Sequence, residues 1–184
     1  MKNSLLIGLA LLITTSVMQA QENQEKQRLT RAEKKELRKQ EQENMQKLVA
    51  GLITNRTFVL EASYLITRYG AMIPVSSTIN FISIDSTNAT FQFGSANHFG
   101  QNGVGGVTID GKISDWIVKT RKKTGVYYIR ATLSSAWGAF DINFDISPTG
   151  MADATITSNY GGILQYSGRI LAPNESRIFK GMAL

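Results

Sequence analysis

Hydrophobic residues near the start of the chain are spaced as on one face of a helix. The i, i+3, i+4, i+7 pattern is formed by Met45, Leu48, Val49, Leu52 and Ile53. The residues before them are mostly Glu, Lys, Gln and Arg, and Thr30 with Glu33 predicts a capping box. We expect a charged helix within residues 21–53 whose second half packs on a domain. The alternative is that its polar half binds a partner.

From Thr57 onward the hydrophobic period changes from 3.6 to 2, which is typical of strands with one buried and one solvated face. In 139–146, for example, apolar residues alternate with small and polar ones. The apolar positions are Phe140, Ile142, Phe144 and Ile146. We expect about eight to nine antiparallel strands, mainly β, as a meander closed into a barrel or folded as a sandwich.

Polar and glycine-containing dipeptides mark the expected turns between these strands. Asp85-Ser86 separates two strands of a hairpin, and Asp110-Gly111 is the strongest short hairpin signal in the chain. The basic run Arg121–Lys123 stands beside Thr124-Gly125, which favours a solvated hairpin tip over a phosphate site.

The first twenty residues have the pattern of a secretory signal peptide. Lys2 precedes an apolar run from Leu5 to Ile13, and a polar segment ends at Ala20, the expected cleavage point. The run is too short to span a bilayer of about 30 Å. The 184 residues include no cysteine, which excludes disulfides and a lipid-modified N-terminal cysteine. We expect an exported protein, periplasmic or secreted, that is neither a lipoprotein nor an integral membrane protein.

Composition suits one globular domain with appendages, since 42% of residues are hydrophobic and 18% are charged. The net charge of +6 is spread along the chain, so a nucleic-acid partner is not expected. The expected division is a signal peptide at 1–20, a charged helix at 21–53, a β-rich domain at 54–172 and a C-terminal tail at 173–184.

Several short segments, in their order along the chain, resemble a known family. They are "FVLEA" at Phe58–Ala62, "GGVTID" at Gly105–Asp110, "SPTGMADATITS" at Ser147–Ser158 and "YSGRI" at Tyr166–Ile170. With the signal peptide and charged helix, this order resembles the secreted Bacteroidetes proteins grouped as domain of unknown function 4251. The resemblance covers residues 48–171. It implies a β-rich periplasmic or surface-facing domain and no assigned activity.

The only histidine, His98, stands in "GSANHFGQNGVGG", which is rich in glycine and asparagine. A zinc site needs several ligands, and this segment supplies one histidine and no acidic residue, so no metal or cofactor is expected. The chain has no G-x-S-x-G motif for a serine hydrolase. We interpret the segment as a long loop between strands; alternatively it is a binding rim with His98 and Phe99 as contacts.

Two acidic residues raise the possibility of acid-base catalysis. Asp141 and Asp145 lie four residues apart on one strand face, about 13 Å from each other. Glycosidases use carboxylates separated by about 5–9.5 Å, so a solvated face is the simpler interpretation. A carboxylate on a neighbouring strand would lie closer to either residue, so an acid-base pair remains the alternative.

Aromatic residues and one hydroxyl complete the candidates. Trp116, Trp137 and Tyr160, with other tyrosines, form either core packing or a stacking surface for sugars. The triplet Asp85-Ser86-Thr87 matches the O-glycosylation pattern of exported Bacteroidetes proteins, with Ser86 as acceptor. We expect a non-enzymatic exported domain that binds a small apolar or amphipathic molecule in a barrel-like sheet. The alternatives are an envelope protein-interaction module and, third, a hydrolase.

Overall fold

In the computed structural model, residues 30–95 and 100–183 are described. The chain divides into two compact units, Met1–Glu43 and Asn44–Leu184, and helix α2 (Arg31–Thr54) runs through their boundary. At its start, the Thr30 N–H donates to Glu33 Oε2 over 2.7 Å, and the Glu33 N–H donates to Thr30 Oγ1 over 3.3 Å. This confirms the capping box, and the bonds from Thr30 lower the pKa of Glu33. Residues 21–29 of the expected helix lie outside the described residues.

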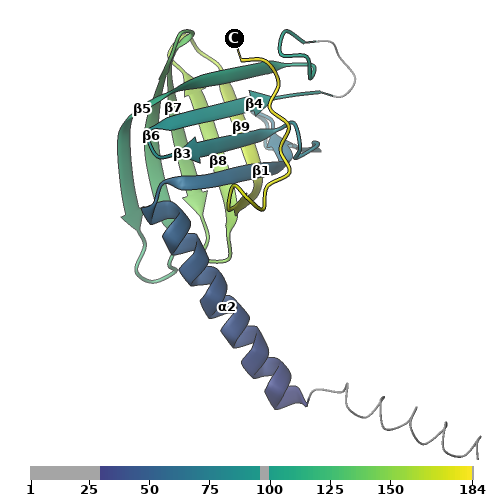
Figure 1. Cartoon of the computed structure of the whole chain (residues 1–184), viewed down its shortest axis with the longest axis vertical. Coiled ribbons are helices and arrows are strands. Elements are labelled where there is room, and N and C mark those ends of the chain that lie inside the picture. Colours follow the sequence, from purple (N-terminus) through teal and green to yellow (C-terminus); the bar gives the residue numbers. More distant parts are fainter. Residues whose placement is uncertain (1–29, 96–99, 184) are drawn as a thin grey trace, which may run out of the picture. The chain divides into compact units, whose positions relative to one another are not determined.

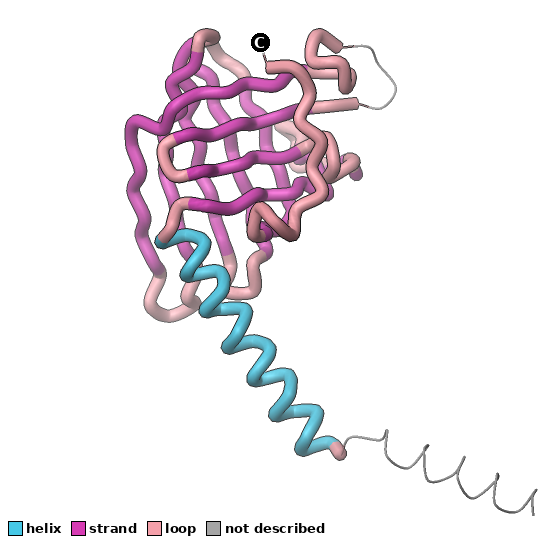
Figure 2. The backbone as a smooth tube through the Cα atoms, viewed as in Figure 1, coloured by secondary structure: helices cyan, strands magenta, loops and turns pink. Residues whose placement is uncertain are grey.

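The rest of the second unit is a sheet of nine antiparallel strands. Its order is β2-β1-β3-β4-β5-β6-β7-β8-β9, and β1 also pairs with β9, which closes β1 and β3–β9 into an eight-stranded barrel (Figures 1 and 2). The mainly β meander is therefore confirmed, in its barrel form. The strands are β1 (Thr57–Ile66), β2 (Met72–Pro74), β3 (Phe81–Asp85), β4 (Asn88–Phe93), β5 (Val107–Thr120), β6 (Tyr127–Ser135), β7 (Gly138–Ile146), β8 (Met151–Ser158) and β9 (Ile163–Leu171).

Strand β2 is the one strand outside the closed barrel. The first half of β1 pairs with β3, and its second half, from Tyr64 to Ile66, pairs with β2. β2 has three residues and ends at Pro74, which has no N–H to donate. A short edge with a proline is a poor template for a further strand.

One predicted turn is wrong. Asp110-Gly111 is not a hairpin turn, because β5 runs without interruption through both residues. A Cβ at Gly111 would lie 2.4 Å from the Ser134 carbonyl oxygen on β6. The close approach of β5 and β6 therefore requires a glycine at this position. The side chain of Asp110 accepts a 2.6 Å hydrogen bond from Thr90 Oγ1 on the neighbouring strand β4.

The barrel interior is filled with large apolar side chains. The alternation predicted for β7 is confirmed from Ile142 to Ile146, since Ile142, Phe144 and Ile146 are buried while Asn143 and Asp145 are exposed; Phe140 is only partly buried. Phe58 meets Phe144 edge to face, with ring centroids 5.6 Å apart. The largest fully buried side chains of the molecule include Tyr166, Phe58, Phe144, Leu60, Ile82, Ile84, Ile129, Leu133, Ile142 and Ile146.

The second half of α2 packs against this core. Val49 and Ile53 are buried, and Met45 and Leu52 are partly buried against the core cluster. Leu48 differs from the prediction and is 41% exposed, because it lies at the margin of the apolar stripe. Within the described part of the chain, no helix is long and apolar enough to cross a membrane.

The C-terminal segment, 172–183, lies along the outer face of the barrel (Figure 1). Glu61 Oε1 accepts hydrogen bonds from Ser176 Oγ and from the Arg177 N–H. Further along, Lys180 Nζ lies 2.5 Å from Asp110 Oδ2. Outward-facing Phe81 lines the hollow beside this segment and is fully buried.

Candidate functional site

Exposed aromatic residues gather on the connections at one end of the barrel. In an antiparallel meander every second connection lies at the same end, so the β1–β2, β6–β7 and β8–β9 connections share the end opposite the start of β1. Each carries one strongly exposed aromatic residue: Tyr69 (81%), Trp137 (53%) and Tyr160 (80%). We call these three residues the aromatic rim.

The three rim turns share one sequence pattern, Ser/Thr-x-Trp/Tyr-Gly. It occurs at Thr67–Gly70, Ser135–Gly138 and Ser158–Gly161. The closing glycines have positive φ values of 80°, 107° and 85°, a conformation that other residues rarely adopt. In the last two turns the serine hydroxyl accepts the N–H of the aromatic residue, at 3.1 Å for Trp137 and 3.2 Å for Tyr160. The backbone of both aromatic residues is thereby held in place.

Two of the rim turns touch. The Asn159 N–H donates to the Ala139 carbonyl oxygen over 3.2 Å, which ties the β8–β9 loop to the start of β7. A Cβ at Gly138 would lie 2.8 Å from Cε2 of Tyr160, so the tyrosine ring rests directly against Gly138, beside Trp137. Trp137 and Tyr160 are therefore neighbouring exposed aromatic residues, and we call them the aromatic pair.

The other aromatic candidates do not join this pair. Trp116 is partly buried against the core, with its ring centroid 6.3 Å from that of Phe58 and 5.6 Å from the Arg56 guanidinium carbon. Tyr166 is fully buried, and its hydroxyl lies 2.7 Å from the Gln92 carbonyl oxygen, to which it donates; burial raises its pKa. Trp116 and Tyr166 are therefore packing residues and not part of an exposed aromatic surface. His98 and Phe99 lie outside the described residues.

Ser86 lies in the β3–β4 turn and is exposed. Its φ is 55°, and its N–H donates to the Arg56 carbonyl oxygen over 2.7 Å. The accessibility that O-glycosylation requires is present, and the modification itself stays a prediction.

The acidic candidates lie on the outer face of β7. Asp141 accepts a 3.0 Å hydrogen bond from Thr132 Oγ1 and lies 3.9 Å from Arg130. Asp145 is directly opposite Asp153 of β8. Partial desolvation and the charge of Asp153 raise the pKa of Asp145. Among the described residues, no group of three potential ligands could hold a metal ion.

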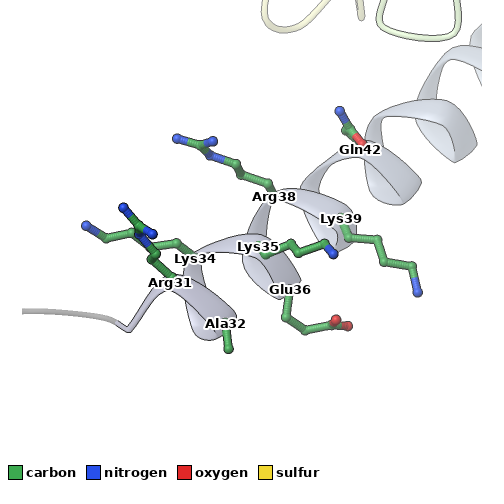
Figure 3. A pocket seen from close by; sticks show the side chains of 8 residues that line it. All are labelled: Arg31, Ala32, Lys34, Lys35, Glu36, Arg38, Lys39 and Gln42. Atoms are coloured by element: carbon green, nitrogen blue, oxygen red, sulfur yellow. The ribbon is translucent and has the colours of Figure 1, made fainter.

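A large surface hollow lies along the first half of α2 and is lined by that helix alone. Figure 3 shows its side chains fanning outward from the ribbon, with no second element among them. Five of them are cationic and one, Glu36, is acidic. This is the solvated flank of a charged helix and encloses no binding site.

The rim turns carry a signal that is readable in the sequence. Trp137 and Tyr160 were among the predicted contacts and Tyr69 was not, although its turn also follows the Ser/Thr-x-aromatic-Gly pattern. The pattern becomes visible only when the turns between strands are aligned with one another, because each copy by itself is four residues long.

Comparison with known proteins identifies the family. The model of a domain of unknown function (DUF4251) matches residues 39–170. The chain belongs to this family. A crystal structure of a DUF4251 family protein from Bacteroides eggerthii DSM 20697 is similar, with 28% identity and a TM-score of 0.63 over 73% of this chain and 92% of that one. No curated protein matches the chain. The C-terminal segment lies beyond the matched family region.

Proposed function

We propose that this DUF4251 protein is an exported, non-enzymatic binding module that contacts its partner through the outside of the barrel end, at the aromatic pair. One observation carries the proposal: the barrel interior is filled, whereas Trp137 and Tyr160 are exposed on two touching turns, each closed by a serine hydroxyl. Exposed aromatic residues of this kind are enriched at binding surfaces.

The filled interior argues against a ligand inside the barrel. Small-molecule carriers keep an interior volume of about 300–1,000 Å³ for the ligand. Here Phe58, Phe144 and Tyr166 point into that space with the branched aliphatic residues around them. The described hollows lie on outer surfaces. We therefore assign binding to the aromatic pair and not to the interior.

The arrangement of the acidic residues supports a non-enzymatic role. A general acid-base pair needs two carboxyl groups facing a substrate-sized cleft. Asp141 is engaged by Thr132 and Arg130, and Asp145 faces Asp153 on an open sheet surface. Export rests on the signal-peptide pattern of residues 1–20, which lie outside the described residues. N-terminal sequencing of the secreted or periplasmic protein, with Gln21 first, would support it.

Site-specific photo-crosslinking in cells tests the proposal, and it works for a partner of any chemical class. A benzophenone amino acid is placed at Trp137 or Tyr160 and, as a matched control, at Ile117, which is 52% exposed on the outer face of β5. We expect a covalent adduct of one defined mass at the two rim positions and none at Ile117. Absence of rim adducts, or equal adducts at all three positions, would overturn the proposal.

A further inference from the structure

We infer that the aromatic pair is a binding site for a neutral carbohydrate chain, with Trp137 and Tyr160 stacking on the apolar faces of two sugar rings. The inference rests on the proposed function and names its ligand class.

The fold does not require an aromatic residue at position 160. Three five-residue loops of the barrel share the same two backbone hydrogen bonds. The N–H of the first residue donates to the carbonyl oxygen of the fifth, and the N–H of the fourth residue, a glycine, donates to the carbonyl oxygen of the first. The loops are 67–71, 147–151 and 158–162. Their third residues are Tyr69, Thr149 and Tyr160. Because an exposed threonine serves the same loop, the 80% exposed ring of Tyr160 has another role.

The two tyrosines of these loops differ in what covers them. The Arg68 guanidinium carbon lies 4.7 Å from the Tyr69 ring centroid, so a cation occupies one face of that ring. Tyr160 instead rests on Gly138 beside Trp137. Only Tyr160 is thus paired with a second exposed aromatic residue, and Tyr69 provides a matched control.

The two turns that carry the pair contain no charged residue, and the nearest charged residues in the strand register are Lys112, opposite Ser134, and Asp141, opposite Thr157. Residues 134–140 and 157–163 contain no Lys, Arg, Asp or Glu, and they supply hydroxyl and amide groups from serine, threonine and asparagine. A sugar ring has an apolar face of C–H groups edged by hydroxyls. An aromatic face with neutral hydrogen-bonding neighbours matches that pattern. A nucleic acid would need cations along its phosphates.

The size of the surface also favours a small ligand. A stable protein interface buries about 800 Å² on each partner. Two aromatic side chains contribute about 150–250 Å² each, which is too little for such an interface and enough for two sugar rings. The edge of β2, limited by Pro74, offers a protein partner little strand pairing.

Ligand-observed NMR on the mature full chain tests this inference. The probes are three neutral hexasaccharides, cellohexaose, maltohexaose and mannohexaose, and hexagalacturonate as an anionic counterpart. We expect saturable binding of at least one neutral probe at concentrations up to about 10 mM and weaker binding of the anionic one. Trp137→Ala and Tyr160→Ala should each weaken binding by about fivefold to tenfold, as expected for loss of one stacking contact.

Two control variants separate stacking from folding. Tyr69→Ala removes an equally exposed tyrosine from the same loop type and should leave affinity unchanged. Trp137→Phe keeps a ring and should retain most of the affinity. If no neutral probe binds while rim crosslinks join a protein, the carbohydrate inference fails and the binding module stands. If neutral probes bind equally to Trp137→Ala and Tyr160→Ala, the inference fails as well.

Discussion

Gln92 joins the barrel to the C-terminal segment through a single side chain. It points outward from β4 and is fully buried. Its Nε2 donates to the carbonyl oxygens of Ile79 at 3.1 Å and Phe179 at 2.9 Å. Its Oε1 accepts from the Gly181 N–H and from Thr108 Oγ1, both at 2.8 Å. Because Gln92 bonds only backbone groups of the segment, these hydrogen bonds do not depend on the segment's side chains.

Gln92→Ala is therefore expected to lower the free energy of unfolding by about 2–4 kcal/mol, because buried backbone groups lose their partners. Denaturant unfolding of the full chain measures the change. Phe179→Ala is the control, since that side chain is 60% exposed and its backbone bonds remain. We expect the control to change stability by no more than about 0.5 kcal/mol. Equal losses in both variants would contradict backbone recognition.

The free energy of unfolding is expected to depend on pH through Asp145, and the direction follows from its raised pKa. Its pKa is raised above 3.8 in the folded protein by partial desolvation and by Asp153. The folded state therefore holds this proton more tightly than the unfolded state, and the contribution to stability falls as pH rises through the raised pKa. In urea unfolding, Asp145→Asn should have a higher midpoint concentration than wild type at neutral pH and the same midpoint well below pH 3.8. A constant difference at all pH values would exclude this cause.

At the scale of elements, α2 has two halves with different roles. The first half carries the capping box and charged residues, and the second half packs Val49 and Ile53 into the core. Val49 Cγ2 lies 3.6 Å from where a Cβ would stand at Gly150, in the β7–β8 loop. The end of the helix is thus part of the domain.

Ile53→Ala should cost about 2–4 kcal/mol of stability by leaving a cavity between α2 and the barrel. Leu48→Ala, five residues earlier on the same helix, should change stability by no more than about 0.5 kcal/mol because Leu48 is exposed. Thermal and urea unfolding of both variants measure the difference. A larger loss for Leu48 would mean that the helix packs through a different face.

At the scale of the whole molecule, the barrel has an interior filled with large apolar side chains. Because its interior is filled, wild type should show no saturable uptake of an apolar fluorescent probe such as N-phenylnaphthylamine. Titration with the probe, before and after detergent extraction of the purified protein, measures this. Stoichiometric uptake after extraction would restore the hypothesis of a ligand inside the barrel.

Much of the fold could be predicted from local patterns. The period-2 segments became strands because alternation of apolar and polar residues specifies a two-faced strand wherever it occurs. The turn prediction at Asp110-Gly111 was wrong because the same dipeptide serves a close strand contact, which depends on Ser134 more than twenty residues away. The capping box was predicted correctly because both of its residues lie within one helical turn.

The candidate site could be predicted in part. Residue type alone points to Trp137 and Tyr160, but equally to Trp116, which packs beside Phe58. Residue type does not distinguish an exposed aromatic residue from a core one, because both occur in strands and turns. Only the register of β7 with β8 brings the two rim turns together.

The sequence by itself determined the local features: the strands, the capped helix, the uncharged turns and the absence of cysteine chemistry. These follow from interactions among residues near one another in the chain. The tertiary structure decided closure of β1 on β9, the filled interior, the position of the C-terminal segment on Gln92 and the contact of Tyr160 with Gly138. Each of these depends on packing between distant segments, which periodicity and composition do not encode.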